Sequence, residues 1–189
     1  MGSGKDEQLG SEASDAHQLA THLWSGEGQD YVRGISDPEL GYAIDVEPRP
    51  SREEVSLRIA EVIASRGTCT RARVGAVITQ DGRPISAGYA GAPSGLAHCI
   101  DVGCDIGNHN GCTRTVHAEA NAISFAARAG ASTQGADIYT TLAPCYDCAK
   151  LIVNSGIRRV FYRNAYRDPR GLNLLDTAGV ETYALEPTG

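Results

Sequence analysis

The sequence lacks any apolar run long enough to cross a bilayer, which takes about 20 residues of α-helix. It also lacks the apolar core of a secretory signal peptide near its first residue. These two absences argue against a helical membrane protein, so we expect a cytoplasmic protein with no membrane partner. In that compartment the six cysteines indicate metal ligands rather than disulfides.

The sequence also has no excess of basic residues, and its formal net charge is -6. Residues 1–50 carry ten acidic and three basic side chains, whereas residues 51–189 carry thirteen and fourteen. The acidity therefore belongs to the N-terminal part, and the remainder is nearly neutral. We expect no broad basic face for a nucleic-acid polymer, although a small anionic ligand would need only a few arginines.

Composition divides the chain into two parts. Residues 1–49 are rich in Gly, Ser, Asp, Glu and Gln, which predicts an acidic N-terminal extension that is poorly ordered or loosely docked. Trp24, Tyr31 and Tyr42 argue against complete disorder there. Residues 50–189 are long enough for one domain with a real core.

This second part begins with a predicted helix. Ser51 is the candidate N-cap and Glu54 would close a capping box. One face of this helix is expected to carry the larger apolar side chains, which are Val55, Ile59, Val62 and Ile63.

The remaining pattern alternates between strands and helices. Asp81-Gly82 is a signal for a β-hairpin turn. The segment from Tyr89 to about Thr113 is predicted to be a long loop, and a loop of this length inside a domain indicates a functional role or a bound metal that holds it in place. The predicted strands are 73–79, 84–88, 136–141, 159–162 and 180–184, and the later helices are 117–128, 144–156 and 171–178. This order predicts an α/β fold with three layers, in which a mixed five-stranded sheet lies between helices.

Two half-motifs carry the chemistry, His117-Ala-Glu119 and Pro144-Cys145-Tyr-Asp-Cys148. His117, Cys145 and Cys148 supply three zinc ligands, and a catalytic zinc keeps its fourth position open for water. Glu119 is close enough to move protons beside the metal. Each half-motif precedes a predicted helix, whose N-terminus favours thiolates and other anions.

Two other interpretations of these residues fit the pattern less well. A lone C-x-x-C can be a redox dithiol, but that motif usually follows the first strand of a thioredoxin-like unit, and here it comes late. A purely structural four-ligand zinc would leave Glu119 without a role. The pattern therefore favours a catalytic zinc.

The other four cysteines, Cys69, Cys99, Cys104 and Cys112, gather before the first strand and in the long loop. They predict a second, structural zinc, because such a loop has little to bury. We favour four thiol ligands, while His98 or His109 could replace one of them. Alternatively, the cysteines are unrelated small apolar side chains.

The stretch from Ile59 to about Val180 resembles the deoxycytidylate deaminases of the cytidine deaminase superfamily. The matching blocks are Ala64-Ser-Arg-Gly-Thr-Cys69, Val74-Gly-Ala-Val-Ile78, Gly88 to Gly95, His98-Cys99, Arg114 to Ile123, Pro144 to Lys150 and Asn154 to Ile157. The resemblance implies a cytidine deaminase-like fold and zinc-dependent deamination of dCMP to dUMP, which feeds thymidylate synthesis. Glu119 would then transfer protons to N3 of cytosine and to the departing ammonia. The second zinc has counterparts in bacterial and phage members at positions matching Cys69 and Cys99.

The resemblance also suggests substrate contacts. The strand with Val74 and Ala76 would pack on the base, and Tyr166, like Tyr162, resembles an aromatic residue at the substrate rim. One departure stands at Ala90, where the family usually has an asparagine that grips the sugar. Candidate phosphate ligands are Ser65, Arg66, Arg71, Arg73 and Arg114.

Regulation and assembly are further implications of the resemblance. Phe125 and Arg128 resemble positions at a subunit interface that helps to hold a dCTP activator, with Mg²⁺ as its counter-ion. Phe125 could equally be a core residue of an amphipathic helix. Family members form homo-oligomers, commonly hexamers, that respond to dCTP and dTTP.

Three other functions share parts of this pattern. Ala90 motivates a deaminase for another or a modified cytosine nucleotide. A tRNA adenosine deaminase also uses H-A-E and P-C-x-x-C, but the missing basic face and the cysteine-rich loop argue against it. A binding module with a purely structural zinc would not need Glu119.

Overall fold

The computed structural model describes residues 35–37, 42–44, 49–107 and 111–186. The chain divides into two compact units, residues 1–49 and 50–189. In the first unit, β1 (Ile35–Asp37) and β2 (Tyr42–Ile44) pair antiparallel, which the sequence had not predicted. Residues 1–34, 38–41 and 45–48 of that unit, and with them the expected loose docking, lie outside the described residues. No helix in the described ranges is long and apolar enough to cross a membrane.

The second unit is a mixed five-stranded sheet in the order β4-β3-β5-β6-β7. β3 pairs antiparallel with β4 and β5, whereas β5, β6 and β7 run parallel. The strands are β3 (Gly75–Gln80), β4 (Arg83–Tyr89), β5 (Asp137–Leu142), β6 (Arg159–Asn164) and β7 (Glu181–Ala184). The predicted Asp81-Gly82 turn is confirmed, since both residues have positive φ, at 52° and 74°, as a type I′ hairpin requires.

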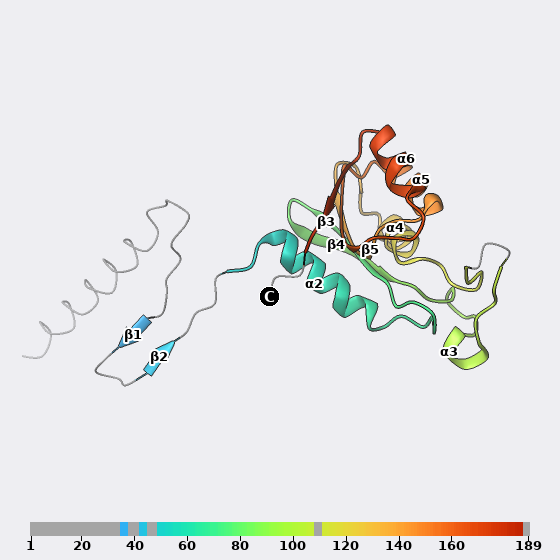
Figure 1. The fold of residues 1–189 in the computed structure, drawn as a ribbon, viewed down its shortest axis with the longest axis horizontal. Helices are drawn as coiled ribbons and strands as arrows, with labels where there is room; N and C mark the ends of the chain where they lie inside the picture. Colours follow the sequence, from blue (N-terminus) through green and yellow to red (C-terminus); the bar gives the residue numbers. More distant parts are fainter. Residues whose placement is uncertain (1–34, 38–41, 45–48, 108–110, 187–189) are drawn as a thin grey trace, which may run out of the picture. The chain divides into compact units, whose positions relative to one another are not determined.

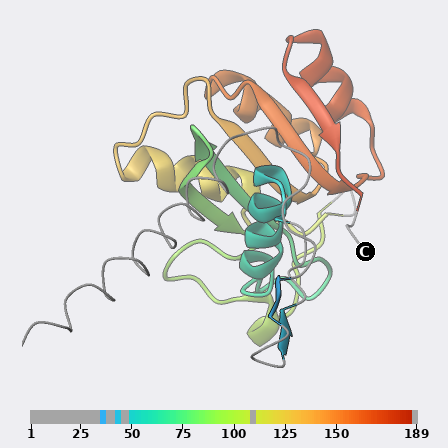
Figure 2. The ribbon, with the colours of Figure 1, turned by 90° about the vertical axis from the view of Figure 1, so that its left-hand side faces the viewer.

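Helices cover both faces of this sheet, so the predicted three-layer fold is confirmed (Figures 1 and 2). The helix α2 (Arg52–Ala64) lies on one face, where Leu57 and Ala60 pack against Val77, Tyr139 and Phe161. The opposite face carries α4 (Ala118–Arg128), α5 (Tyr146–Asn154) and α6 (Arg170–Thr177). A short helix, α3 (Cys99–Val102), interrupts the predicted long loop.

Two glycines set how closely the helices approach the β3–β4 hairpin. A Cβ at Gly75 would lie 2.0 Å from the carbonyl oxygen of Ala60 in α2, and one at Gly88 would lie 2.4 Å from that of Ala118 in α4. Only glycine permits these contacts. The start of α4, which follows His117, is therefore pressed against the end of the hairpin.

The predicted start of α2 is confirmed, because Ser51 Oγ accepts the N–H of Glu54 at 3.0 Å. The predicted apolar face of this helix is wrong at two positions, since Val55 is 41% and Val62 is 69% exposed. Leu57, Ala60 and Ala64 face the sheet instead. Ala60 and Ala64 occupy the positions where the helix lies closest to Gly75 of β3.

Candidate active site

The first three predicted zinc ligands come from two helix N-termini. His117 is the N-cap of α4, Cys145 is the N-cap of α5, and Cys148 lies in the first turn of α5. Their ligand atoms all lie within 4.8 Å of one another. The helix ends favour negative charge, as the thiolates of a metal site require.

The distances within this group fit a zinc ion. Nδ1 of His117 lies 3.3 Å from Sγ of Cys145 and 3.5 Å from Sγ of Cys148. A tetrahedral zinc with bonds of about 2.0 Å to nitrogen and 2.3 Å to sulfur has an N···S edge of about 3.5 Å. The three side chains therefore occupy three corners of such a tetrahedron, with Nδ1 as the histidine ligand atom.

The charges of this group are shared through hydrogen bonds. A bond from Cys148 lowers the pKa of the Cys145 thiol to about 4, and a bond with Cys145 raises the pKa of His117 to about 9. The arrangement thus stabilises a thiolate beside a cation. A divalent metal would take the place of the proton on His117, because ligating histidine is neutral.

Glu119 lies in the first turn of α4 and is only 4% exposed. Burial raises the pKa of its carboxyl to about 7, and it also faces His117, Cys145 and Cys148. A carboxyl with a pKa near neutral can both accept and release a proton at physiological pH, which is what general acid–base catalysis requires. Its position beside the ligands suits proton transfer.

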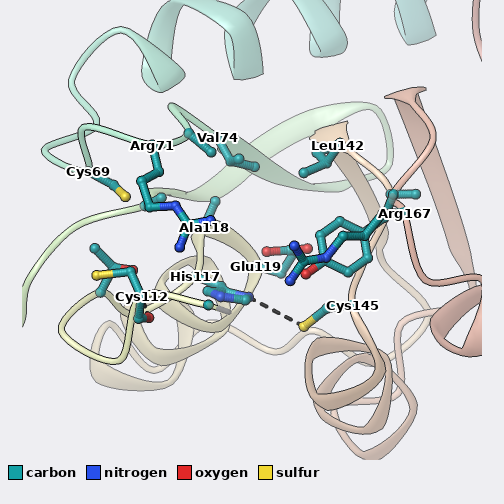
Figure 3. A pocket seen from close by; sticks show the side chains of 16 residues that line it. Cys69, Arg71, Val74, Cys112, His117, Ala118, Glu119, Leu142, Cys145 and Arg167 are labelled. Atoms are coloured by element: carbon teal, nitrogen blue, oxygen red, sulfur yellow. Dashed lines mark hydrogen bonds between the residues drawn. The ribbon is translucent and has the colours of Figure 1, made fainter. Parts of the chain in front are cut away.

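A pocket of about 260 Å³ opens onto Glu119 and His117 (Figure 3). Its walls are largely apolar, with Val74, Ala90 and Leu142 among them. Two arginines also line it, Arg71 from the α2–β3 loop and Arg167 from the β6–α6 loop. The pocket therefore combines an apolar slot, a proton-transfer group and two positive charges. The full lining is Cys69, Arg71, Ala72, Val74, Ala90, Gly111, Cys112, Thr115, His117, Ala118, Glu119, Leu142, Ala143, Cys145, Tyr166 and Arg167.

Three of the seven predicted substrate residues line this pocket, namely Val74, Ala90 and Tyr166. The other four do not belong to the lining. Ala76 is fully buried in β3, and Ser65 caps α2 with its hydroxyl donating to the carbonyl of Val62 at 2.7 Å. Arg66 is exposed and Arg114 is half-buried. Their substrate role stays a prediction.

Sequence reasoning missed several lining residues. Arg71 was one of several phosphate candidates, but nothing singled it out, and Arg167 was not considered although it directly follows Tyr166. Leu142 is the last residue of β5, and Ala143 connects it to the Pro144-Cys145 motif, so their position was a signal. Thr115 likewise lies two residues before His117.

The second predicted metal site is also brought together. Cys69, Cys99, Cys104 and Cys112 have all their sulfurs within 4.8 Å of one another. Cys69 and Cys104 are 3.8 Å apart and Cys99 and Cys112 are 3.5 Å apart, close to the S···S edge of about 3.8 Å in a zinc–thiolate tetrahedron. His98 is not part of the group, and His109 lies outside the described residues.

The electrostatics of this second group call for a cation. Burial raises the pKa of the Cys99 thiol to about 12. Burial also opposes ionisation of Cys112, yet the backbone N–H groups of Arg114, Asp105 and Thr115 lower its pKa to about 6. Four thiolates at these distances repel one another, and a divalent metal removes that repulsion.

The residues expected at a subunit interface lie on the outside of α4. Phe125 is 47% exposed and is therefore not a core residue, and Arg128 is exposed in the last turn. Neither lines the pocket. Their role in an interface or effector site stays a prediction.

Comparison with known proteins gives a consistent result. Residues 50–164 match the model of the cytidine and deoxycytidylate deaminase zinc-binding region. ComE operon protein 2 of Bacillus subtilis is 43% identical over 129 residues, covering 67% of each chain. The deoxycytidylate deaminase of Enterobacteria phage T4 is 35% identical over 166 residues, covering 67% of this chain and 86% of the phage protein.

Among solved structures, the dCMP deaminase of the cyanophage S-TIM5 in complex with dCMP and dUMP is similar throughout its length. It has a TM-score of 0.65 and 31% identity, and the match covers 74% of this chain and 100% of that chain.

Proposed function

The chain belongs to the cytidine and deoxycytidylate deaminase family, and from that premise we propose that it hydrolyses dCMP to dUMP and ammonia with a catalytic zinc. The observation that carries the proposal is the pocket itself. It places buried Glu119 beside the His117, Cys145 and Cys148 group and adds two arginines for an anionic substituent. A phage deaminase of similar fold was solved with dCMP and dUMP, which supports this substrate.

His117, Cys145 and Cys148 are the residues that would hold the zinc. A zinc bound there would supply Lewis acidity, which makes a hydroxide nucleophile available near neutral pH. The protein's own contribution is the positioning of cytosine and the movement of protons. The apolar walls formed by Val74, Leu142 and Ala143 suit a planar base and exclude bulk water.

Glu119 would act on both sides of the reaction. As a carboxylate it takes a proton from the attacking water and passes it to N3 of cytosine. It then takes the second proton from the hydroxyl added at C4 and passes it to the departing amine. Burial raises the pKa of this carboxyl above its usual value, which favours its use as an acid as well as a base. Water adds to C4, the C4–N bond breaks and C4 becomes a carbonyl. Ammonia leaves with one transferred proton, and the other stays on N3.

Arg71 and Arg167 would bind the 5′-phosphate. Arginine forms bidentate charge-assisted hydrogen bonds with phosphate oxygens, and both residues line the pocket and are exposed to solvent. The second cluster would hold a structural zinc, so that each chain carries two. The expected effectors dCTP and dTTP, an accompanying Mg²⁺ and a homo-oligomeric or hexameric state stay predictions that rest on family resemblance.

A second candidate is deamination of a different or modified cytosine nucleotide. Ala90 favours it, because this pocket residue presents a methyl group where the family usually has an amide. The sugar then has one hydrogen-bonding partner fewer.

The test is ammonia release from dCMP, CMP, dCTP and deoxycytidine by the full chain, with zinc measured on the same sample. We expect the highest kcat/KM with dCMP. Higher kcat/KM with another of these compounds would replace dCMP as substrate. No turnover of any of them by protein with a filled catalytic site would overturn the deaminase assignment for cytosine nucleotides.

A further inference from the structure

The nucleotide pocket is walled by both cysteine clusters. Cys69 and Cys112 of the four-cysteine cluster line it, as do His117, Glu119 and Cys145 of the catalytic site. Figure 3 shows Cys69 and Cys112 toward one end of the lining and Cys145 toward the other. A metal site elsewhere in the loop would contribute no residue to the pocket wall.

Cys69 fixes one segment of the wall. Arg71, Ala72 and Val74 lie within five residues after it in the chain, and all three line the pocket. This segment is also tied to Ala90, because the N–H of Thr68 donates to the Ala90 carbonyl at 3.0 Å and the N–H of Ala90 donates to the Val74 carbonyl at 2.9 Å. Movement at Cys69 would therefore shift Arg71 and the Ala90 wall together.

Cys112 fixes a second segment of the wall. Its sulfur accepts hydrogen bonds from backbone N–H groups that include that of Thr115, and the Thr115 hydroxyl donates to the Cys112 carbonyl at 3.5 Å. Val116 and Gly91 then exchange two backbone bonds of 2.9 and 3.2 Å, immediately before His117. The thiol is thus coupled through Thr115 to the approach to the catalytic histidine.

The other two thiols complete the cluster without lining the pocket. Cys99 is 1% exposed in α3, and Cys104 is half-buried in the loop beyond it. A metal bound by all four sulfurs sets the separation between the Cys69 and Cys112 segments. The catalytic groups are instead held by the N-termini of α4 and α5.

We propose that the four-cysteine cluster, through a metal held by Cys69, Cys99, Cys104 and Cys112, positions the wall of the nucleotide pocket and so sets nucleotide affinity, with little effect on the chemical step. This inference rests on the proposed nucleotide-binding function of the pocket. Cys69 and Cys112 are positioning residues, because they act through Arg71 and Thr115.

The first test is the Cys104→Ser variant of the full chain, since Cys104 removes a ligand without removing a pocket atom. We expect KM for dCMP to rise about tenfold while kcat stays within about twofold, an effect in the range of coupled sites. Cys104→His keeps a metal ligand and should restore KM. Ile106→Ser, at a 50% exposed position of the same loop, is the matched control with unchanged KM. A fall in kcat at unchanged KM would overturn the proposal.

The second test leaves the cluster intact and uses thermodynamic reciprocity. If the metal raises nucleotide affinity, the nucleotide must raise metal affinity by the same factor. The full chain carrying Glu119→Gln is loaded with Co²⁺, whose tetrathiolate absorbance reports this cluster separately from the catalytic site. A chelator then competes with and without dUMP, and we expect about tenfold protection of the tetrathiolate signal.

Calorimetry of dUMP binding to the same sample separates the possible failures. Bound dUMP without protection of the tetrathiolate signal would overturn the coupling and leave the proposed function intact. Absence of dUMP binding to a chain with both metal sites filled would overturn the nucleotide-binding function itself, and the coupling with it.

Discussion

The two metal clusters differ in their ligands and in what lies beside them. The catalytic group offers one nitrogen and two sulfurs, and buried Glu119 and an open pocket adjoin it. The other group offers four sulfurs, which complete a tetrahedron without an outside ligand. Three ligands leave one coordination position for water, whereas four leave none.

The difference also concerns charge. Two thiolates neutralise a divalent cation, so the catalytic site keeps its electrophilic character toward a fourth ligand. Four thiolates exceed the cation's charge, which quenches that character and leaves a tightly held structural centre. Ligand number and type therefore support the proposal that one cluster performs chemistry and the other positions the pocket wall.

The largest expected difference follows from removing one ligand of each cluster. Cys148→Ala should reduce zinc content from two to one per chain and abolish deamination, because the catalytic metal is lost. Cys99→Ala should also remove one zinc, but it should lower the melting temperature more, since a structural zinc contributes to folding free energy. Metal analysis, calorimetric melting and ammonia release check this pair.

The two clusters would not differ in role if Cys148→Ala and Cys99→Ala lost the same fraction of activity and had the same melting temperature. The comparison would also break if carefully purified parent protein held a single zinc per chain, because the second cluster would then be a group of free thiols. Two variants on the same loop serve as references. Cys104→Ser should have a smaller effect on activity, and Ile106→Ser should have none.

A carboxylate lies near each cluster, and the second prediction compares them. Glu119→Gln should lower kcat by about 10²–10⁴-fold while zinc content and fold are retained, because the proton carrier is lost and the ligands remain. Asp101→Asn, at an exposed position of α3, should leave kcat unchanged. Turnover of Glu119→Gln within a few-fold of the parent chain would remove Glu119 from the mechanism.

Motif spacing predicted most of what separates the two clusters. His117, Glu119, Cys145 and Cys148 lie in two short segments before helices, so local helix geometry is sufficient to place them. The strand and helix pattern likewise predicted the three-layer sheet, since alternation of apolar residues is a local signal. The exclusion of His98 needed coordinates, because loop geometry decides which side chains converge.

The phosphate-binding candidates could not be separated by sequence. Arg66, Arg71 and Arg73 are close together, and which one reaches the pocket depends on how the α2–β3 loop is held by Thr68 and Ala90. Arg167 belongs to a loop about fifty residues after His117 and lacks a motif of its own. The outward position of Val55 and Val62 also follows from tertiary packing, since helix periodicity alone favours the larger apolar side chains.

The third prediction concerns the arginines of the pocket between the clusters. Arg71→Gln or Arg167→Gln should lower kcat/KM for dCMP by about 10- to 100-fold, because a charge-assisted hydrogen bond contributes about 1.5–3 kcal/mol. Deoxycytidine, which lacks the phosphate, should show no such loss. Arg66→Gln, exposed and outside the lining, is the matched control. Equal losses with dCMP and deoxycytidine would exclude phosphate binding by the substituted arginine.

The smallest expected effect lies at Ala90, which is 6% exposed in the wall and fixed by backbone bonds to Thr68 and Val74. If dCMP is the substrate, Ala90→Asn should supply a hydrogen bond to the sugar. A neutral bond of about 0.5–1.5 kcal/mol corresponds to a two- to tenfold rise in kcat/KM. Ala92→Asn, two residues further along the loop and outside the lining, should have no effect. The measurement is kcat/KM for dCMP in zinc-matched samples of all three proteins.

A fall in kcat/KM with Ala90→Asn, together with better parent activity on another cytosine nucleotide, would mean that the methyl group makes room for a different sugar or base. The two clusters would keep their roles in that case, and only the ligand between them would change.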